Sequence, residues 1–257
     1  MSRTIAIVNQ KGGVGKTATA VNLAATLAAC EQRVLLLDCD PQGNASTGFG
    51  LRKNSPQPSL YQFLIGHNPL EQVVRQIISP WLHVVPSSPD LSGAEIELVN
   101  TSARESWLRK RLQGAGSSYD YILLDCPPSL GLLTVNGLVA ADSVLVPLQC
   151  EFYAMEGMSQ LLRTLELVRR GLNPALQLGG ILLTMFDATA PGQVQIAREV
   201  RQHLGLKVFD TVIPRHTAVS EAPSFGKPVI WYDLQSTGSR AYMQLAQEIL
   251  RKKEANP

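Results

Sequence analysis

Hydrophobic residues are concentrated in seven short runs, most of which are apolar at consecutive positions. A strand with one face in water alternates apolar and polar residues, whereas a parallel strand covered on both faces is apolar throughout. The pattern therefore predicts buried, mostly parallel strands. We expect them at Thr4–Val8, Val34–Asp38, Leu82–Val85, Tyr121–Asp125, Ser143–Leu148, Gly180–Met185 and Val208–Ile213.

Helical segments separate these runs. We expect helices at Thr17–Cys30, Ser102–Gln113, Leu130–Ala140, Tyr153–Gly171, Pro191–Leu204 and Ser239–Lys253. Such alternation is typical of an α/β fold, a doubly wound, mostly parallel sheet with helices on both faces. We expect residues 1–257 to form a single domain in which ligands bind beyond the carboxyl ends of the strands. The segment 44–66, rich in Gly, Pro, Ser and Gln, predicts a surface excursion with one short helix near Leu60–Leu64.

Composition narrows the class of protein without identifying it. Hydrophobic residues make up 45% of the 257 residues and charged residues 17%, as in ordinary globular proteins. The net charge of +2 does not by itself indicate nucleic-acid binding. The first apolar strand follows Arg3 almost directly, which does not fit a secretory signal, and no apolar run is long enough to cross a bilayer. We therefore expect a cytoplasmic protein.

A glycine-rich segment, residues 9–17, links the first strand to the first helix and reads Asn-Gln-Lys-Gly-Gly-Val-Gly-Lys-Thr. Glycines let backbone N–H groups turn towards phosphate oxygens, and the helix N-terminus adds positive potential. Lys16 would contact the β- and γ-phosphates, and the Thr17 hydroxyl would coordinate Mg²⁺. Gln10 stands where the strict phosphate-loop pattern has glycine. The sequence predicts an ATP site formed by Lys11, Gly12, Gly13, Val14, Gly15, Lys16, Thr17 and Ala18.

Three aspartates lie at or just beyond the ends of two apolar strands: Asp38, Asp40 and Asp125. A carboxylate at the end of a buried strand is costly unless a cation or hydrogen-bond donors offset its charge, and Mg²⁺ is the natural partner near a phosphate loop. We expect Asp125 to hold a magnesium-bound water, Asp38 to support the metal shell and Asp40 to orient the attacking water. The alternative is that one of the three merely caps a turn before proline, which is a more natural role for Asp38 than for Asp40 or Asp125.

The four cysteines, Cys30, Cys39, Cys126 and Cys150, form no CxxC pair and no zinc-ligand spacing. We expect them to be free, buried and packed as small hydrophobic residues.

Five separated motifs, in order, carry a family resemblance. They read KGGVGKT, LLLDCDPQGNAS, YDYILLDCPPSLGLLT, PLQCEFYAMEG and VIPRHTAVSEAPSFGKPV. Together they resemble a ParA/Soj-type partition ATPase of the deviant Walker-A class, over roughly Thr4 to Leu250. The resemblance implies an ATP-dependent homodimer, slow hydrolysis stimulated by a ParB-like activator, and non-specific DNA binding.

The resemblance also implies roles for single residues. Lys11 is identified as the signature lysine that would reach the partner subunit's nucleotide, where its charge would act like an arginine finger, and Gly12 would allow close approach. Pro214 lies where the family builds its adenine pocket, and Met185 would line it too. For both residues ordinary loop packing is the alternative.

Two positions depart from the family pattern. Relatives carry DNA-binding arginines where this chain has Thr189 and Ala218. Local basic surface can still bind phosphates, although a solvated helix face is the simpler interpretation of each single cation. The remaining candidates are Arg163, Arg169, Arg170, Arg198, Arg201, Lys207, Arg215, Lys227 and Arg240.

Three other functions fit the fold class, but the sequence does not favour any of them. A MinD-like membrane ATPase needs an amphipathic tail, whereas the apolar face of Tyr242–Arg251 belongs to the last predicted helix, so we do not expect membrane binding. A metal-cluster carrier needs paired cysteines that the chain lacks. The segments DPQGN and SEAPSFGKP do not fit a small-molecule ligase of the same fold, such as dethiobiotin synthetase.

Overall fold

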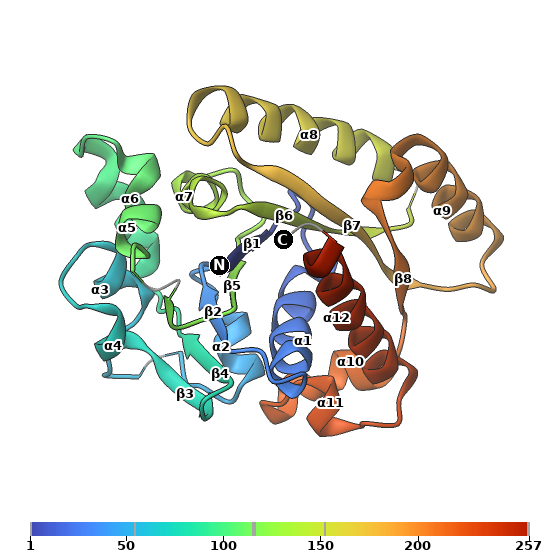
Figure 1. Cartoon of the computed structure of the whole chain (residues 1–257), viewed down its shortest axis with the longest axis horizontal. Coiled ribbons are helices and arrows are strands. Elements are labelled where there is room, and N and C mark those ends of the chain that lie inside the picture. The colour runs from blue at the N-terminus through green and yellow to red at the C-terminus, as the bar shows by residue number, and fades with distance from the viewer. Residues whose placement is uncertain (1, 54, 115–116, 152, 256–257) are drawn as a thin grey trace.

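The computed structural model describes residues 2–53, 55–114, 117–151 and 153–255 (Figure 1). In this part of the chain eight strands form one sheet in the order β3-β4-β2-β5-β1-β6-β7-β8. Every neighbouring pair is parallel except β3 and β4. The strands are β1 Arg3–Ile7, β2 Val34–Asp38, β3 Arg75–Ile78, β4 Leu82–Val85, β5 Tyr121–Asp125, β6 Ser143–Gln149, β7 Gln177–Phe186 and β8 Val208–Pro214. The predicted doubly wound, mostly parallel sheet is confirmed.

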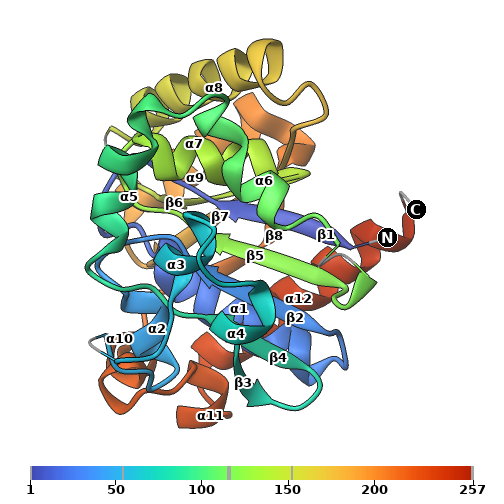
Figure 2. The same ribbon diagram turned by 90° about the vertical axis from the view of Figure 1, so that its left-hand side faces the viewer.

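Both faces of the sheet are covered, because successive residues of a strand point to opposite sides. On β2, Leu35 and Leu37 belong to one core, and Val34 and Leu36 belong to the other. Helices α7, α8 and α9 cover the first face, and α1 and α12 cover the second (Figures 1 and 2). The helices are α1 Lys16–Ala29, α2 Asn44–Gly48, α3 Leu60–Leu64, α4 Leu70–Val73, α5 Leu91–Glu97, α6 Trp107–Arg111, α7 Leu132–Ala140, α8 Ala154–Gly171, α9 Pro191–Leu204, α10 Thr217–Glu221, α11 Val229–Tyr232 and α12 Thr237–Ala255.

The seven predicted strands are all present, but β3 was missed. Half-buried and exposed residues alternate along this strand, which lies at the edge of the sheet and contains Arg75 and Gln76. A short, half-polar edge strand lacks the continuous apolar run that identified the others.

The predicted helix Ser102–Gln113 is wrong in extent. Ala103 has a left-handed backbone with φ of 51°, and a short 3₁₀ turn, Arg104–Ser106, precedes the five-residue α6. Helix α7 begins at Leu132 rather than Leu130. The predicted short helix Leu60–Leu64 is confirmed as α3.

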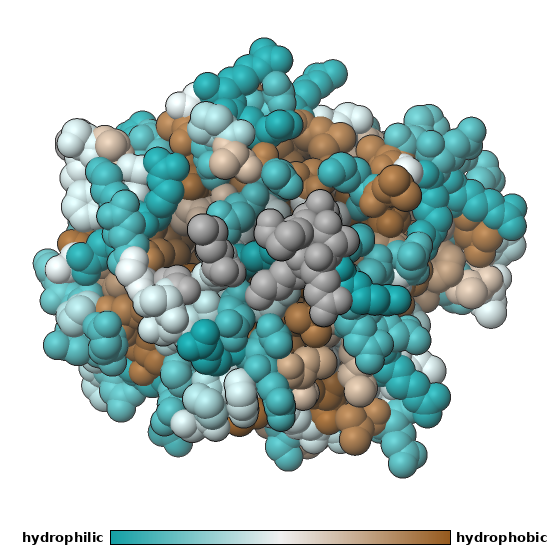
Figure 3. Space-filling model, in the orientation of Figure 1, coloured by the Kyte–Doolittle hydropathy of each residue, from teal (hydrophilic) through white to brown (hydrophobic). Residues whose placement is uncertain are grey.

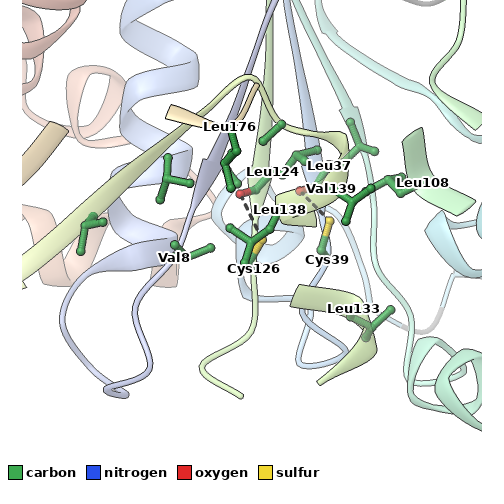
Figure 4. Packing of buried hydrophobic residues seen from close by; sticks show 14 of the residues in the cluster. Val8, Leu37, Cys39, Leu108, Leu124, Cys126, Leu133, Leu138, Val139 and Leu176 are labelled. Carbon is green, nitrogen blue, oxygen red and sulfur yellow. Dashed lines mark hydrogen bonds between the residues drawn. The ribbon is translucent and has the colours of Figure 1, made fainter. Parts of the chain in front are cut away.

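The cysteines are free, as predicted, but one is not buried. Cys39, Cys126 and Cys150 are buried, whereas Cys30 caps the end of α1 and is exposed. Cys39 and Cys126 lie among leucine and valine side chains in the core beneath α7 (Figure 4). Burial raises the pKa of both thiols, so they pack as small hydrophobic groups.

Side chains of α9 and α12 bind backbone groups of β8, the strand at one edge of the sheet. The Glu248 carboxylate on α12 accepts hydrogen bonds from the backbone N–H groups of Asp210 and Thr211, each at 3.0 Å. Arg201 on α9 donates to the carbonyl oxygen of Phe209 at 3.1 Å. Backbone groups that a ninth strand could use are therefore already paired within the chain.

The apolar face of α12 packs into the protein, as the sequence predicted. Leu245, Ala246 and Ile249 are buried in the core shared with α1. Among the described residues, no helix combines the length and the apolar character that a membrane span requires.

Candidate functional site: a phosphate loop at the carboxyl ends of the strands

The glycine-rich loop has the backbone that its glycines allow. Gly13 and Gly15 adopt left-handed conformations, with φ of 74° and 87°, in which a side chain would be strained. Gly15 caps helix α1, which begins at Lys16. Residues 9–15 thus form a tight turn that ends at a helix N-terminus, an arrangement that favours anions.

Lys16 is buried within this loop, with 7% of its surface exposed. Its ammonium donates a hydrogen bond to the backbone carbonyl of Lys11 at 3.0 Å. Burial lowers the pKa of Lys16, and the nearby charges of Asp125 and Asp40 partly oppose that shift. A buried ammonium held by one neutral carbonyl gains strongly from an anionic ligand, because phosphate would offset its desolvation.

Lys11 is placed differently, at the rim of the loop. Its side chain is 50% exposed, and its ammonium forms an ion pair with Glu151, which follows β6. The Lys11 backbone N–H donates to Asn9 Oδ1 at 3.0 Å, and Asn9 Nδ2 donates to the carbonyl of Pro147 at 2.7 Å. Asn9 and Glu151 were not among the predicted site residues, although each lies just beyond the end of a strand, β1 and β6 respectively.

Asp38 and Asp125 are directly opposite each other in the β2–β5 register, and both are completely buried. Asp38 accepts from the Ser46 N–H at 2.7 Å and the Ser46 hydroxyl at 2.6 Å, with a longer contact of 3.4 Å from the Asp40 N–H. Burial nevertheless raises the pKa of Asp38 to about 6, against the lowering effect of the Ser46 hydrogen bonds.

Asp125 lacks such support. Within the described part of the chain, neither of its carboxylate oxygens has a partner that meets hydrogen-bond geometry. Burial raises its pKa well above the ordinary value and the Asp38 charge adds to the rise, while Thr17 and Lys16 act in the opposite direction. A buried carboxylate without partners, beside a threonine hydroxyl at the phosphate loop, fits Mg²⁺. No cluster of three or more His, Cys, Asp or Glu side chains that could hold a metal occurs among the described residues, so nucleotide oxygens and waters would complete the coordination.

Asp40 is partly buried and lies in a turn. Its Oδ1 accepts from the Gln42 N–H at 2.9 Å, and its carbonyl accepts from the Gly43 N–H at 2.9 Å. The turn-capping role that was the alternative for Asp38 is therefore observed at Asp40. Its charge still reaches the loop, because it raises the pKa of Lys16.

The two residues expected at an adenine pocket lie in different surroundings. Met185 has a left-handed backbone with φ of 51°, and its Cε lies 3.7 Å from the position that a Cβ on Gly15 would occupy. Pro214 lines a groove of about 610 Å³ between the ends of β7 and β8 and helix α12, with Phe186, Arg215 and Arg240. Met185 is not among the residues lining that groove.

The two positions that depart from the family pattern also differ. Thr189 is exposed and closes a turn, its hydroxyl donating to Asp187 Oδ1 at 2.6 Å. Ala218 is buried in α10, with 4% exposure. The remaining cations are spread over α8, α9, α12 and their loops, and Figure 3 shows hydrophilic surface over α8 and α9. On α8, Arg169 and Arg170 both pair with Glu166.

The strand–loop–helix turn, the buried lysine and the aspartates at neighbouring strand ends define a P-loop nucleotide-binding protein. Residues 2–178 match the family model of an AAA domain. The chain is 52% identical to the chromosome partitioning protein ParA of Myxococcus xanthus over 252 residues, which cover 98% of this chain and 89% of that relative. It is 50% identical to the sporulation initiation inhibitor protein Soj of Bacillus subtilis, over 97% and 98% of the two chains. This chain therefore belongs to the ParA/Soj family of chromosome partitioning ATPase homologues.

Solved structures agree with the fold and the cofactors. Cobyrinic acid a,c-diamide synthase from Mycobacterium smegmatis with bound ADP and magnesium superposes with a TM-score of 0.88, at 34% identity, over 100% of this chain and 97% of that one. The cell division ATPase MinD of Pyrococcus furiosus superposes with a TM-score of 0.79 at 24% identity, over 98% and 100% of the two chains, which shows the fold alone. The same synthase with a bound ATP analogue and magnesium superposes with a TM-score of 0.87, also at 34% identity, over 100% of this chain and 98% of that one.

Proposed function

We propose that the protein is an ATPase that dimerises on ATP, hydrolyses it slowly, and positions or segregates DNA or another large cargo. The observation that carries this proposal is the contrast between the two lysines of the loop. Lys16 is buried within its own phosphate site, whereas Lys11 is half-exposed at the rim, with its ammonium held outward by Glu151. A cation so placed is available to a second subunit's nucleotide.

The remaining residues take roles that fit their positions. Loop N–H groups and Lys16 would bind the phosphates, and Thr17 would hold Mg²⁺. Asp125 would accept from a metal-bound water, and Asp38, held by Ser46, would support the metal shell from behind. Bound Mg²⁺ supplies charge that stabilises the transferring phosphoryl group. Asp40 would orient the attacking water. We also propose that residues 1–257 form one domain, because one sheet draws its strands from residues 3 to 214.

The geometry of Asp40 supports the proposal that hydrolysis is slow. Asp40 is occupied by its own turn, accepting from Gln42. A carboxylate that is committed to a turn would position water only after the loop rearranges, for instance when a partner binds. This supports stimulation of hydrolysis by a ParB-like activator. A long-lived ATP-bound state would give the protein time to bind its cargo or surface before hydrolysis releases it.

Exchanging Asp40 and Lys11 separately for alanine tests the proposed dimer. Asp40→Ala should bind ATP, lose hydrolysis and accumulate as a dimer in light scattering, because phosphate and metal contacts remain. Lys11→Ala should keep nucleotide affinity in the monomer but lose dimerisation and hydrolysis, because only the rim charge is removed. Lys16→Ala, which should lose nucleotide binding altogether, is the control. If Lys11→Ala dimerises with ATP as readily as the parent does, the proposed role of Lys11 across the interface is wrong.

DNA binding is the second part of the proposal, and dimerisation would be its cause. The candidate cations are dispersed on the monomer, but two weak basic surfaces on one rigid dimer bind a polyanion far better than either alone. We expect a labelled random duplex to bind with ATP but not with ADP, and to be released steeply as salt rises. Fluorescence anisotropy across a salt series measures this. We also propose that the protein is cytoplasmic and associates with the nucleoid through this DNA binding. Absence of binding with ATP at low salt would reject both DNA as the surface on which the protein acts and the nucleoid association.

The alternative functions are less well supported. The face of α12 that a MinD-like membrane anchor would need is packed in the core, and liposome sedimentation tests it directly. The likeness to a diamide synthase concerns a protein with 34% identity, below the 50–52% identity to the partition proteins.

A further inference from the structure

One side chain outside the loop bonds directly to it. Thr184 lies near the end of β7, is 2% exposed, and donates its hydroxyl hydrogen to the carbonyl oxygen of Val14 at 2.8 Å. The two residues are 170 positions apart in the sequence. The bond therefore joins the phosphate loop to the opposite half of the chain.

The direction of this bond bears on nucleotide binding. In a planar trans peptide, the carbonyl and the following N–H point to opposite sides. A loop that cradles an anion turns its N–H groups inward and its carbonyls outward. Because Thr184 holds the Val14 carbonyl outward, the Gly15 N–H that shares this peptide is fixed towards the inside of the loop.

The apolar part of Thr184 packs against the same place. Its Cβ and Cγ2 lie 3.8 and 3.9 Å from where a Cβ on Gly15 would be, and Met185 Cε lies at 3.7 Å. Met185 adopts a left-handed backbone, which is costly for a residue with a side chain and persists only where the surroundings enforce it. The end of β7 therefore supports Gly15 from behind by packing and by a hydrogen bond.

We propose that Thr184 is a positioning residue that holds the phosphate loop in its anion-binding conformation before nucleotide arrives. This role deepens the proposed function and rests on the ATP site of the family, but it does not depend on dimerisation, hydrolysis or DNA. Without the hydroxyl, the buried Val14 carbonyl loses its partner and the Val14–Gly15 peptide is free to rotate. Nucleotide binding must then fix the orientation of this peptide, and the free energy that this costs reduces the affinity for nucleotide relative to the parent.

Two substitutions separate the hydroxyl from the packing. Thr184→Val keeps the shape and removes the donor, whereas Thr184→Ser keeps the donor and removes a methyl group. We expect Thr184→Val to bind Mg·ADP about tenfold more weakly, the size of one hydrogen bond's contribution, and Thr184→Ser to stay within about twofold of the parent. The matched control is Thr26→Val, which removes a buried hydroxyl that donates to Asn22 O at 2.8 Å in α1, away from the loop.

The measurements are calorimetric titration of each variant with Mg·ADP, and KM and kcat for ATP. A positioning role raises KM and leaves kcat at saturating ATP unchanged, since the lost interaction is the same in ground and transition states. Parental ADP affinity in Thr184→Val would overturn the proposal, as would equal losses in Thr184→Ser or Thr26→Val. If Thr184→Val does not fold, Thr184→Ala replaces it, and its difference from Thr184→Ser isolates the hydroxyl. Failure of the parent itself to bind Mg·ADP would instead contradict the nucleotide site.

Discussion

Strands β2 and β5 both end in an aspartate, and the loops that follow them leave the two carboxylates in different states. Asp38 and Asp125 are directly opposite each other on adjacent strands, and both are completely buried. The loop after β2 folds back through α2 and gives Asp38 two short hydrogen bonds from Ser46. The loop after β5 runs through Pro127 and Pro128, which have no N–H to donate. Among the described residues, no partner of either Asp125 oxygen meets hydrogen-bond geometry, although Thr17 and Lys16 lie near enough to act on its pKa.

The difference separates two uses of a buried carboxylate. Asp38 organises the protein, because its bonds hold α2 and, through the Ser46 hydroxyl, the backbone of Ser87. Asp125 keeps most of its desolvation cost, which Thr17 and Lys16 offset only in part and which a cation from outside would offset further. Carboxylates at equivalent positions can therefore be held by the protein on one strand and left open to a ligand on the next.

The largest effect should come from Asp125→Asn. We expect the affinity of the nucleotide-bound protein for Mg²⁺ to fall about 10- to 100-fold, the range for groups that hold metal-bound water. The nucleotide-free protein should become more stable, because the buried asparagine carries no charge to desolvate. Thermal unfolding with ADP across a Mg²⁺ titration measures both. Asp38→Asn is the matched control, and an equal loss of Mg²⁺ affinity in it would contradict the distinction between the two aspartates.

A pH effect on the free energy of unfolding should distinguish Asp38→Asn from the parent. The folded pKa of Asp38 is about 6, above the ordinary value of about 3.9. Folding therefore favours its protonated form, and this contribution to stability is complete below about pH 4 and is lost as pH rises through 6. Without nucleotide, the parent should lose up to about 3 kcal/mol relative to Asp38→Asn between pH 4 and 7. Denaturant unfolding at several pH values measures the difference, and parallel curves would show that Asp38 does not titrate in this way.

Ser46→Ala should have the smallest effect. It brings Asp38 closer to the state of Asp125 by removing a side-chain hydrogen bond to its carboxylate. It removes one hydrogen bond to Asp38 and leaves the Ser87 N–H without its acceptor, while the Ser46 backbone bond remains. We expect a loss of about 1–2 kcal/mol in unfolding free energy. Ser46→Thr, which keeps the hydroxyl, is the control, and identical stability of the alanine variant and the parent would show that the backbone bond alone suffices.

The sequence predicted the strands and the phosphate loop because both depend on local patterns. Continuous apolar runs mark strands covered on both faces, and glycines at 13 and 15 meet a local backbone requirement. The helix expected at Ser102–Gln113 failed because its polar residues fit a helix as well as a turn, and only the observed left-handed Ala103 shows the break.

The supporting residues of the site could not be predicted in the same way. Glu151 and Thr184 act on the loop from 140 and 170 positions away, and nothing in their neighbouring residues indicates which loop they will meet. Ser46 lies only eight residues from Asp38, but its bond requires α2 to fold back, which the Gly- and Ser-rich composition did not reveal.

The covered edge of β8 limits how copies of this protein can assemble. Strand addition, which joins sheets into larger sheets or fibrils, needs free backbone groups at an edge. Glu248 and Arg201 occupy such groups in the middle of β8, and at the opposite edge β3 has four residues and an irregular register. Continuous intermolecular sheets are thereby disfavoured. The ATP-dependent association proposed above would then meet no competition from edge pairing, which nucleotide could not reverse.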